Sequence, residues 1–470
     1  MSTRTLKTRF CPSPTGLLHI GNLRTALISA LIAMKEKGIF LLRIEDTDKA
    51  RSELGFAEEL QADLKWLGLE WQEGPGKDAG NGPYWQSQRQ NIYDHYYQAL
   101  EAKNLAYPCF CSEEQLALSR KIQRSSGKPP RYAGTCRYLS AEAVSEKIAQ
   151  GLKPTLRFKV PNTVISFEDV VHGKQSFDGE DIGDFIIRRA DGSASFMFCN
   201  AIDDALMGVT LASRGEDHLT NTPRQLFILN ALELPMPQYA HISLIFGLDG
   251  APLSKRNGSK SLKDLQAEGY LPLAIVNHLA RLGHFYPETE LLSLANLAAK
   301  FSTTALSKSP AKFDPEQLKY WQKQALQHTN NAELWPWLPE EVKLMVPTEQ
   351  QLAFVTAIKP NILFPQDAIV WAHALFDKHL SLDNAQQMVL KAADLNFFTE
   401  ALKAVSLYGC DYQAIIGHLK TTLNIQGKAL FQPLRLALTG QGHGPDMALI
   451  CQLLGITRLQ ARFNDVLQIL

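Results

Sequence analysis

The sequence has 470 residues, of which 45% are hydrophobic and 20% are charged, and its formal net charge is zero. This composition is typical of a folded protein, and the length predicts about three domains. The charge balance does not indicate a nucleic-acid-binding protein. It does not exclude one, because such binding needs a local basic surface and not a positive net charge. The first residues contain no apolar segment of the secretory kind, and the longest apolar runs are too short to cross a bilayer. Seven cysteines in so long a chain favour a reducing, cytoplasmic environment.

The start of the chain predicts a strand, a helix and a second strand. Residues 7–11 form a short mixed segment that Pro12 and Pro14 end. From Leu23 onward apolar residues recur at helical spacing, and Gly38 favours a stop. Residues 39–44 (IFLLRI) are an apolar run interrupted by one arginine, as in a buried parallel strand. We therefore expect a βαβ unit.

The turn before this helix is a candidate anion site. In a βαβ unit the helix N-terminus lies at the carboxyl end of the first strand, where free N–H groups and the helix dipole favour phosphate. Gly16 and Gly21 would allow close approach of the backbone, and His19 and Asn22 would supply side-chain donors. A plain turn with a surface histidine explains the same residues, so the tetrapeptide HIGN alone does not distinguish a phosphate site from such a turn.

A second candidate phosphate-binding segment is LSKRNG at residues 253–258, in a stretch whose glycines and serines predict a loop. A loop that carries adjacent cations, here Lys255 and Arg256, can close over a polyphosphate and stabilise charge on a leaving pyrophosphate. The alternative is a solvated basic loop.

Several longer motifs together carry a family resemblance. HIGN and LSKR resemble the two signatures of class I aminoacyl-tRNA synthetases. The surrounding segments narrow the resemblance to bacterial glutamyl-tRNA synthetases, and they run nearly from end to end: TRFCPSPTGLLHIGNLRTAL, LLRIEDTD, SRGEDHLTNTPRQ, PLSKRNG, SKSPAKFD and PLRLALTG.

The resemblance implies an α/β fold: a class I Rossmann-like parallel-sheet catalytic domain with an inserted acceptor-arm-binding domain, followed by an α-helical anticodon-binding region. We expect the catalytic domain at residues 1–100 and 191–250 and the insertion at 101–190. A stem-contact region with the LSKR loop is expected at 251–325, and the helical region at 326–470. The helical pattern of the last part differs from the β-barrel anticodon part of bacterial glutaminyl enzymes.

The implied reaction has two steps. Glutamate attacks the α-phosphate of ATP, giving glutamyl-adenylate and pyrophosphate, and the 3′-terminal adenosine of tRNA then takes the acyl group. His19 would hydrogen-bond to the ATP phosphates and Lys255 would stabilise the leaving pyrophosphate, so both are expected to be catalytic. ATP and Mg²⁺ are the implied cofactors. The residues expected around ATP are Gly16, His19, Gly21, Asn22, Ser254, Lys255 and Arg256.

The implied glutamate site is built from complementary charges. Arg9 and Arg214 match the glutamate-facing arginines of the family, and a guanidinium group binds a carboxylate through two parallel hydrogen bonds. The resemblance implies that Arg214 binds the side-chain carboxylate, because glutaminyl enzymes lack an arginine at this place. A neutral glutamine amide would leave such a cation unpaired, which is a source of specificity. Ser13 and Glu45 are the candidates for contact with the ammonium group.

Two positions depart from the family pattern. Phe196 stands where the family usually has tyrosine, so a hydroxyl is lost, and Asn200 is a candidate to supply part of that polar contact. Asn22 stands in the place of a second signature histidine, and its amide can donate a hydrogen bond but carries no charge.

A zinc site is implied by the family's cysteine pattern in the insertion. Cys109, Cys111 and Cys136 supply thiolates, the ligands that Zn²⁺ prefers. The family's fourth ligand is a histidine, and here Tyr138 occupies that place. Tyr132 is the alternative fourth ligand, because a short paralogue of the family uses a tyrosine at this spacing from the last cysteine. The remaining alternative is three reduced cysteines in a metal-free loop.

The implied partners are tRNA(Glu), L-glutamate and ATP, with no membrane, and we expect a monomer. Basic residues of the last part fit contacts with RNA phosphates; they are Lys420, Lys428, Arg435, Arg458 and Arg462. Two alternatives stay open: a relaxed or specialised glutamyl enzyme that charges tRNA(Gln), and a non-catalytic RNA-binding relative.

Overall fold

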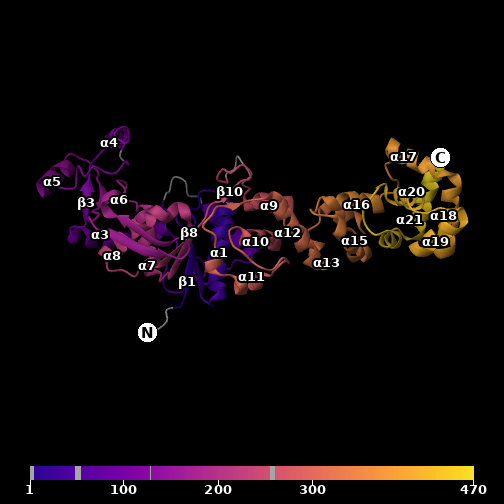
Figure 1. The fold of residues 1–470 in the computed structure, drawn as a ribbon, viewed down its shortest axis with the longest axis horizontal. Coiled ribbons are helices and arrows are strands. Elements are labelled where there is room, and N and C mark those ends of the chain that lie inside the picture. The colour runs from indigo at the N-terminus through magenta and orange to yellow at the C-terminus, as the bar shows by residue number, and fades with distance from the viewer. Residues whose placement is uncertain (1–4, 48–53, 128, 254–259) are drawn as a thin grey trace. The chain divides into compact units, whose positions relative to one another are not determined.

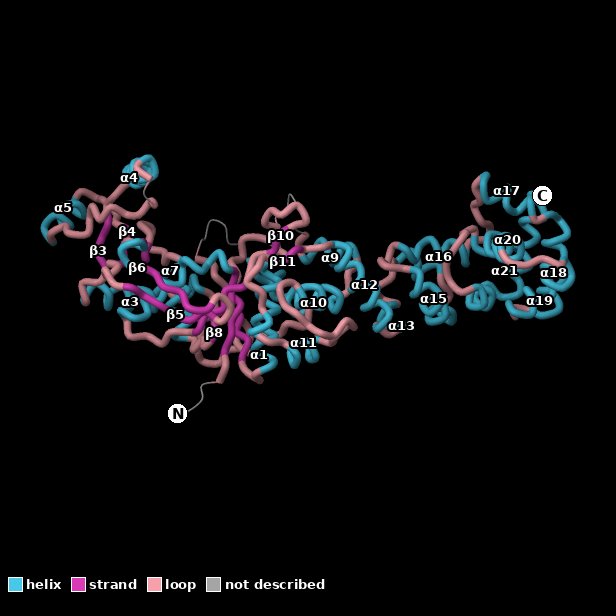
Figure 2. The backbone as a smooth tube through the Cα atoms, in the orientation of Figure 1, coloured by secondary structure: helices cyan, strands magenta, loops and turns pink. Residues whose placement is uncertain are grey.

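The computed structural model describes residues 5–47, 54–127, 129–253 and 260–470, and the chain divides into two compact units. The first unit comprises Met1–Leu265 and Ile275–Leu318, and the second comprises Gln266–Ala274 and Lys319–Leu470. Strands lie in the first unit, whereas the second is drawn as helices and loops (Figures 1 and 2). Within the described ranges, none of the helices combines the length and apolar character that crossing a bilayer requires.

The predicted βαβ unit is confirmed. Strand β1 (Lys7–Phe10) pairs in parallel with β2 (Ile39–Leu42), and helix α1 (Ile20–Lys35) connects them. Leu23, Leu27 and Leu31 of α1 are fully buried, since the helix packs against β1 on one side and against α11 (Leu294–Lys300) on another. The carboxyl ends of the strands and the start of α1 therefore come together at one edge.

A four-stranded sheet with the order β6-β5-β9-β8 continues the first unit. Strands β8 (Leu211–Gly215) and β9 (Gln238–Ile242) are parallel, and α8 (Thr222–Ala231) connects them. The backbone N–H of Thr210 donates to the carbonyl oxygen of Lys7 at 2.9 Å, so β8 begins beside β1.

Strands β5 (Val164–Asp169) and β6 (Gly173–Asp178) form an antiparallel hairpin that joins this sheet, because Asp169 pairs with Tyr239 of β9. Part of the segment 101–190 thus belongs to the sheet that carries β8. This attachment was not expected from the sequence.

A separate antiparallel sheet contains β3 (Ala106–Cys109), β4 (Thr155–Phe158) and β7 (Phe185–Arg188). Strand β7 pairs with β4, so it belongs to this sheet and not to the sheet that carries β8. Helices α3 (Gln90–Ala102) and α7 (Phe196–Leu206) contribute Tyr97 and Phe198 to the core beneath this sheet, with ring centroids 4.3 Å apart. The other elements of the first unit are α2 (Leu54–Trp66), α4 (Glu113–Ser125), α5 (Ala141–Ala149), α6 (Gly179–Ile182), β10 (Ile245–Phe246) and β11 (Ala311–Lys312).

Helices build the second unit, as predicted. Three helices cross the unit boundaries: α9 (Leu262–Glu268), α10 (Pro272–Arg281) and α12 (Pro315–His328). The helices that lie wholly in the second unit are α13 (Asn331–Leu334), α14 (Glu340–Met345), α15 (Gln351–Ile358), α16 (Asp367–Phe376), α17 (Asn384–Ala392), α18 (Asp394–Tyr408), α19 (Tyr412–Leu423), α20 (Lys428–Thr439) and α21 (Met447–Ile469). Their apolar faces form one core, to which Phe354, Phe398 and Phe463 contribute buried rings.

One predicted surface residue of this unit lies inside it. Arg462 is buried and donates from Nη2 to the carbonyl oxygens of Ala374 and Asp377, at 3.2 and 2.7 Å, where α16 ends. The expectation that Arg462 belongs to a basic surface is therefore wrong. Lys420 and Lys428 are exposed, and Arg435 and Arg458 are half-buried.

Candidate active site

A cavity of about 470 Å³ lies where β1, the start of α1 and the end of β8 meet. It brings together residues that the sequence analysis assigned separately to glutamate and to ATP. Those in its lining are Arg9, Ser13, Gly21, Asn22, Glu45, Phe196, Asn200 and Arg214.

Gly16 and His19 belong to the turn before α1 and are not part of this lining. His19 is the N-cap residue of α1, has extended backbone angles and forms a β-bridge with Ser261. Its side chain does not cap the helix, which leaves the N–H groups of the first turn for another acceptor. Ser254, Lys255 and Arg256 lie outside the described residues.

Arg9 is held in place by two buried acceptors. Its Nε atom donates to the carboxylate of Asp204 at 3.2 Å, and its Nη1 donates to the carbonyl oxygen of Ser213 at 2.7 Å. Only 2% of Arg9 is exposed, so it is not part of a surface ion pair. These contacts connect β1 with α7 and β8 and fix a cation in the cavity wall.

Glu45 belongs to the same buried charge network. Arg43 donates to Oε1 of Glu45 at 3.2 Å and to Asp204 at 2.7 Å, and the Asn200 amide donates to Glu45 at 2.6 Å. Burial raises the pKa of Glu45, and the favourable contacts with Arg43 and Asn200 offset only part of this rise. For Asp204, burial acts in the same direction, but Arg9 and Arg43 outweigh it and lower the pKa.

Arg214 lies at the end of β8 and is 5% exposed. Its Nε donates to Nε2 of His241 at 3.2 Å and its Nη2 donates to the Thr222 hydroxyl at 2.7 Å. The third nitrogen, Nη1, is buried and has no hydrogen-bond partner in the part of the chain that the structure describes. Since an unpaired buried guanidinium nitrogen is unfavourable, this atom is the natural donor for a bound anion.

Phe196 lines the same cavity as these cations, and the sequence analysis missed its neighbour His218. The two rings have centroids 5.3 Å apart, and both residues line the cavity. The Asn221 amide donates to Nδ1 of His218 at 3.1 Å, so a neutral His218 carries its proton on Nε2. Burial lowers the pKa of His218, which favours this neutral form.

Comparison with known proteins agrees with this geometry. A family model described as the catalytic domain of class I tRNA synthetases (E and Q) matches residues 5–320, and an anticodon-binding-domain model matches residues 332–467. The chain belongs to the class I tRNA synthetases of this group. The resemblance inferred from the motifs is thereby confirmed.

Relatives of full length narrow the family further. Glutamate–tRNA ligase 2 of Coxiella burnetii is 58% identical over 98% of this chain and 100% of its own length. Glutamate–tRNA ligase 2 of Nitrosococcus oceani is 51% identical, with 99% of each chain covered. The crystal structure of a glutamate tRNA ligase from Elizabethkingia meningosepticum in complex with its amino acid superposes with a TM-score of 0.88 at 28% identity, covering 99% of both chains. An enzyme of the glutamyl branch, with the predicted α/β catalytic and helical anticodon parts, accounts for these matches.

The predicted zinc-binding cysteines form one cluster in this synthetase. The sulfur atoms of Cys109, Cys111 and Cys136 lie within 4.8 Å of one another. The Tyr132 hydroxyl lies 3.4 Å from the sulfur of Cys109 and 3.5 Å from that of Cys111. Tyr138, by contrast, is 84% exposed.

The chemistry of this cluster suits a cation. Burial alone would raise the pKa of Cys109, but hydrogen bonding with Tyr132 and Arg157 lowers it to about 7. Three closely spaced sulfurs and one phenol oxygen make a donor set of four, which fits the number of ligands that Zn²⁺ takes.

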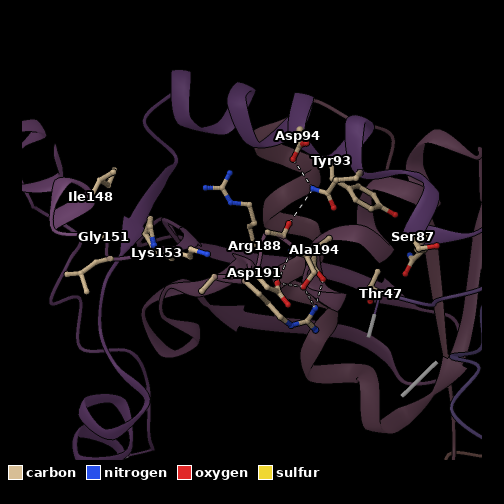
Figure 3. A pocket seen from close by; sticks show the side chains of 18 residues that line it. Thr47, Ser87, Tyr93, Asp94, Ile148, Gly151, Lys153, Arg188, Asp191 and Ala194 are labelled. Atoms are coloured by element: carbon tan, nitrogen blue, oxygen red, sulfur yellow. Dashed lines mark hydrogen bonds between the residues drawn. The ribbon is translucent and has the colours of Figure 1, made fainter. Parts of the chain in front are cut away.

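A larger cavity of about 1250 Å³ lies between α3 and the inserted segment, and Figure 3 shows the side chains around it. Lys153, Arg188 and Arg189 give its lining a basic character, with Asp94 and Asp191 as acids. The Arg188 guanidinium also lies over the ring of Tyr97, 5.5 Å from its centroid. The sequence analysis did not predict this cavity.

Proposed function

We propose that this chain attaches L-glutamate to tRNA(Glu) in two steps, ATP-dependent formation of glutamyl-adenylate and transfer to the tRNA 3′ end. The observation that carries the proposal is the placement of Arg9, Arg214 and Glu45 around one cavity. Two guanidinium groups and one carboxylate complement the two carboxylates and the ammonium group of glutamate.

Within this proposal Arg214 binds the side-chain carboxylate through Nη1, and Arg9 supplies the second cation of the site. Ser13 and Glu45 contact the ammonium group. Catalysis then depends on position and charge, since the reaction needs no protein nucleophile. ATP would lie at the N-terminal turn of α1, near His19, Gly21 and Asn22, and Mg²⁺ bound with it would neutralise charge on its phosphates.

Lys255 is proposed to stabilise the leaving pyrophosphate. Lys255→Ala should slow adenylate formation, measured as exchange of labelled pyrophosphate into ATP in the presence of tRNA. An unchanged rate would mean that the leaving-group role is wrong.

We also propose that Cys109, Cys111, Cys136 and Tyr132 hold Zn²⁺. The ion would join the end of β3 to the segment after α4, within which the Tyr132 hydroxyl already accepts a hydrogen bond from the backbone N–H of Cys136 at 2.8 Å. Its chemistry would be structural, because four protein ligands leave no open position for substrate.

The proposed acceptor-arm contacts involve the basic cavity of the insertion. Lys153, Arg188 and Arg189 are suited to phosphate groups of an RNA strand. The helical residues that match an anticodon-binding domain are proposed to contact the other end of tRNA.

Charging of purified tRNA(Glu) and tRNA(Gln) with labelled glutamate, and in parallel with labelled glutamine, tests the proposal. Charging of tRNA(Glu) with glutamate alone is the expected result. Charging of tRNA(Gln) as well, or instead, would replace it with a relaxed or specialised enzyme. Charging of neither tRNA would overturn it in favour of a non-catalytic RNA-binding protein.

A further inference from the structure

A buried chain of hydrogen bonds lies behind Arg214 and ends on a strand of the inserted segment. Nδ1 of His241 lies 2.6 Å from Oδ2 of Asp169, and Nε2 of His241 lies 3.2 Å from Nε of Arg214. Asp169 is 1% exposed and His241 is 0% exposed. Asp169 is the last residue of β5, His241 belongs to β9 and Arg214 belongs to β8, so the chain crosses three neighbouring strands.

The donors and acceptors in this chain are determined by Arg214. A guanidinium N–H can only donate, so Nε2 of His241 must be the acceptor and carries no proton. We therefore assign the proton of a neutral His241 to Nδ1, from which it is donated to Asp169. The Asp169 carboxylate also accepts from the backbone N–H groups of Val171 and His172, at 2.9 and 2.8 Å, which fixes its orientation.

The other edge of Arg214 is fixed by Thr222. Its hydroxyl accepts from Nη2 of Arg214 at 2.7 Å and lies 3.0 Å from Nε2 of His241. The guanidinium group also lies over the ring of Tyr239, 4.9 Å from its centroid. Two nitrogens of Arg214 are thus held by protein groups, and Nη1 is the one whose partner is not supplied by the described residues.

We propose that Asp169 and His241 are positioning residues that fix the orientation of Arg214 and thereby set the affinity and selectivity for a substrate side-chain carboxylate. The inference rests on the proposed function, in which Arg214 binds that carboxylate. A planar guanidinium group discriminates a carboxylate from an amide only when its plane and its free edge are fixed. His241 fixes the plane from behind, and Asp169 keeps His241 in the tautomer that can accept.

Two substitutions of His241 separate its two bonds. In His241→Gln the amide oxygen can take the place of Nε2 and accept from Arg214, whereas the side chain of His241→Asn reaches Asp169 but is too short for Arg214. We expect His241→Asn to raise the KM for glutamate about ten-fold or more, as for loss of a hydrogen bond to a charged group. His241→Gln should recover part of this loss. The kcat and the KM for ATP should change by less than about three-fold in both variants, since the defect lies in a site that binds the amino acid alone.

A second pair of substitutions, at Thr222, tests the same proposal if the variants of His241 do not fold. Thr222→Val has nearly the shape of threonine but lacks the hydroxyl that accepts from Nη2, and Thr222→Ser keeps that hydroxyl. The valine variant should raise the KM for glutamate and lower the preference for glutamate over glutamine, whereas the serine variant should retain both values.

Arg214→Gln distinguishes failure of this inference from failure of the proposed function. If Arg214→Gln leaves the KM for glutamate unchanged, the role of Arg214 itself is wrong. If Arg214→Gln abolishes glutamate binding while His241→Asn and Thr222→Val retain the parental KM, only the positioning inference is overturned. Equal losses of kcat and of affinity for both substrates in the His241 and Thr222 variants would also overturn it, because they would indicate a general structural defect.

Discussion

Arg43 donates from Nη1 to the Asp204 carboxylate at 2.7 Å, and both side chains are almost entirely buried. The same carboxylate accepts from Arg9 at 3.2 Å. One buried acid therefore contacts two cations, of which only Arg9 lines the cavity at the end of β8. The network explains how a cation remains in an interior wall without an external counter-ion.

Asp204→Asn should destabilise the first unit by about 3 kcal/mol, because removing one member of a buried ion pair leaves its partners uncompensated. The measurement is denaturant unfolding at pH 7. The pKa of Asp204 is lower in the folded protein than the value of about 3.9 that an aspartate has in the unfolded chain. Its contribution to the free energy of unfolding is therefore present above about pH 3.9 and is lost as the pH falls further. The difference between the two proteins should therefore shrink below about pH 4.

Glu70→Gln is the matched control, since Glu70 forms an exposed ion pair with Lys77 at 3.1 Å. Its effect should stay within about 0.5 kcal/mol. Equal stabilities of Asp204→Asn and the parent protein would show that the buried network is not held by this carboxylate.

Phe196→Tyr should lower the KM for glutamate about five-fold, the effect of one added hydrogen bond. Phe196 lines the proposed glutamate cavity beside His218, where a tyrosine hydroxyl would add a donor to the wall. The KM for ATP should not change. Phe285→Tyr makes the same chemical change on a ring that is 73% exposed and is expected to have no effect. An unchanged KM for glutamate in Phe196→Tyr would show that the absence of a tyrosine hydroxyl at this position does not affect glutamate binding.

The local parts of the fold follow from the sequence, whereas the supporting contacts do not. The βαβ unit is encoded within one short stretch whose proline, glycine and apolar pattern can be interpreted directly. Arg9, Glu45 and Arg214 lie in motifs, and the cavity confirms that they meet. His241 and Asp169 are 72 positions apart, and their pairing depends on the hairpin β5-β6 joining the sheet, which has no local signature.

The charge of a basic residue also does not show whether its side chain lies on the surface or is buried. Lys420 and Arg462 both carry a positive charge in the last part of the chain. Lys420 is exposed, whereas Arg462 is buried and donates hydrogen bonds to the carbonyl groups at the end of α16. The distinction depends on which helix packs against α21, a long-range property. The acids Asp203 and Asp204 illustrate the same limit, because their partners Arg89 and Arg43 are far away in the sequence. Both are buried and paired with arginines.

Acid should destabilise the first unit before its carboxylates are protonated. Burial lowers the pKa of both His278 and His284 to about 4. In the unfolded chain a histidine takes up a proton near pH 6.5, so the free energy of unfolding should fall as the pH decreases from about 6.5 to 4, by up to about 1.4 kcal/mol per pH unit for each histidine.

His284→Gln should reduce this slope. The backbone N–H of Ser302 donates to Nε2 of His284 at 3.1 Å, and a glutamine oxygen can accept the same bond without titrating. The check is the denaturation midpoint measured at pH 8, 6 and 4.5. His443→Gln, a change of an exposed histidine, serves as the control. A slope identical in His284→Gln and the parent protein would mean that His284 is not the group that takes up the proton.

The fourth ligand of the cysteine cluster can be decided with two conservative substitutions. Tyr132→Phe removes the hydroxyl that lies 3.4 and 3.5 Å from the sulfurs of Cys109 and Cys111, and Tyr138→Phe removes one from a side chain that is 84% exposed. We expect about one zinc per chain in the parent protein and in Tyr138→Phe, and faster loss of zinc to a chelator in Tyr132→Phe, because a site with three protein ligands is open to exchange. The measurement is metal content before and after dialysis against the chelator. Faster loss in Tyr138→Phe would assign the ligand to Tyr138, and a parent protein without zinc would leave three reduced cysteines.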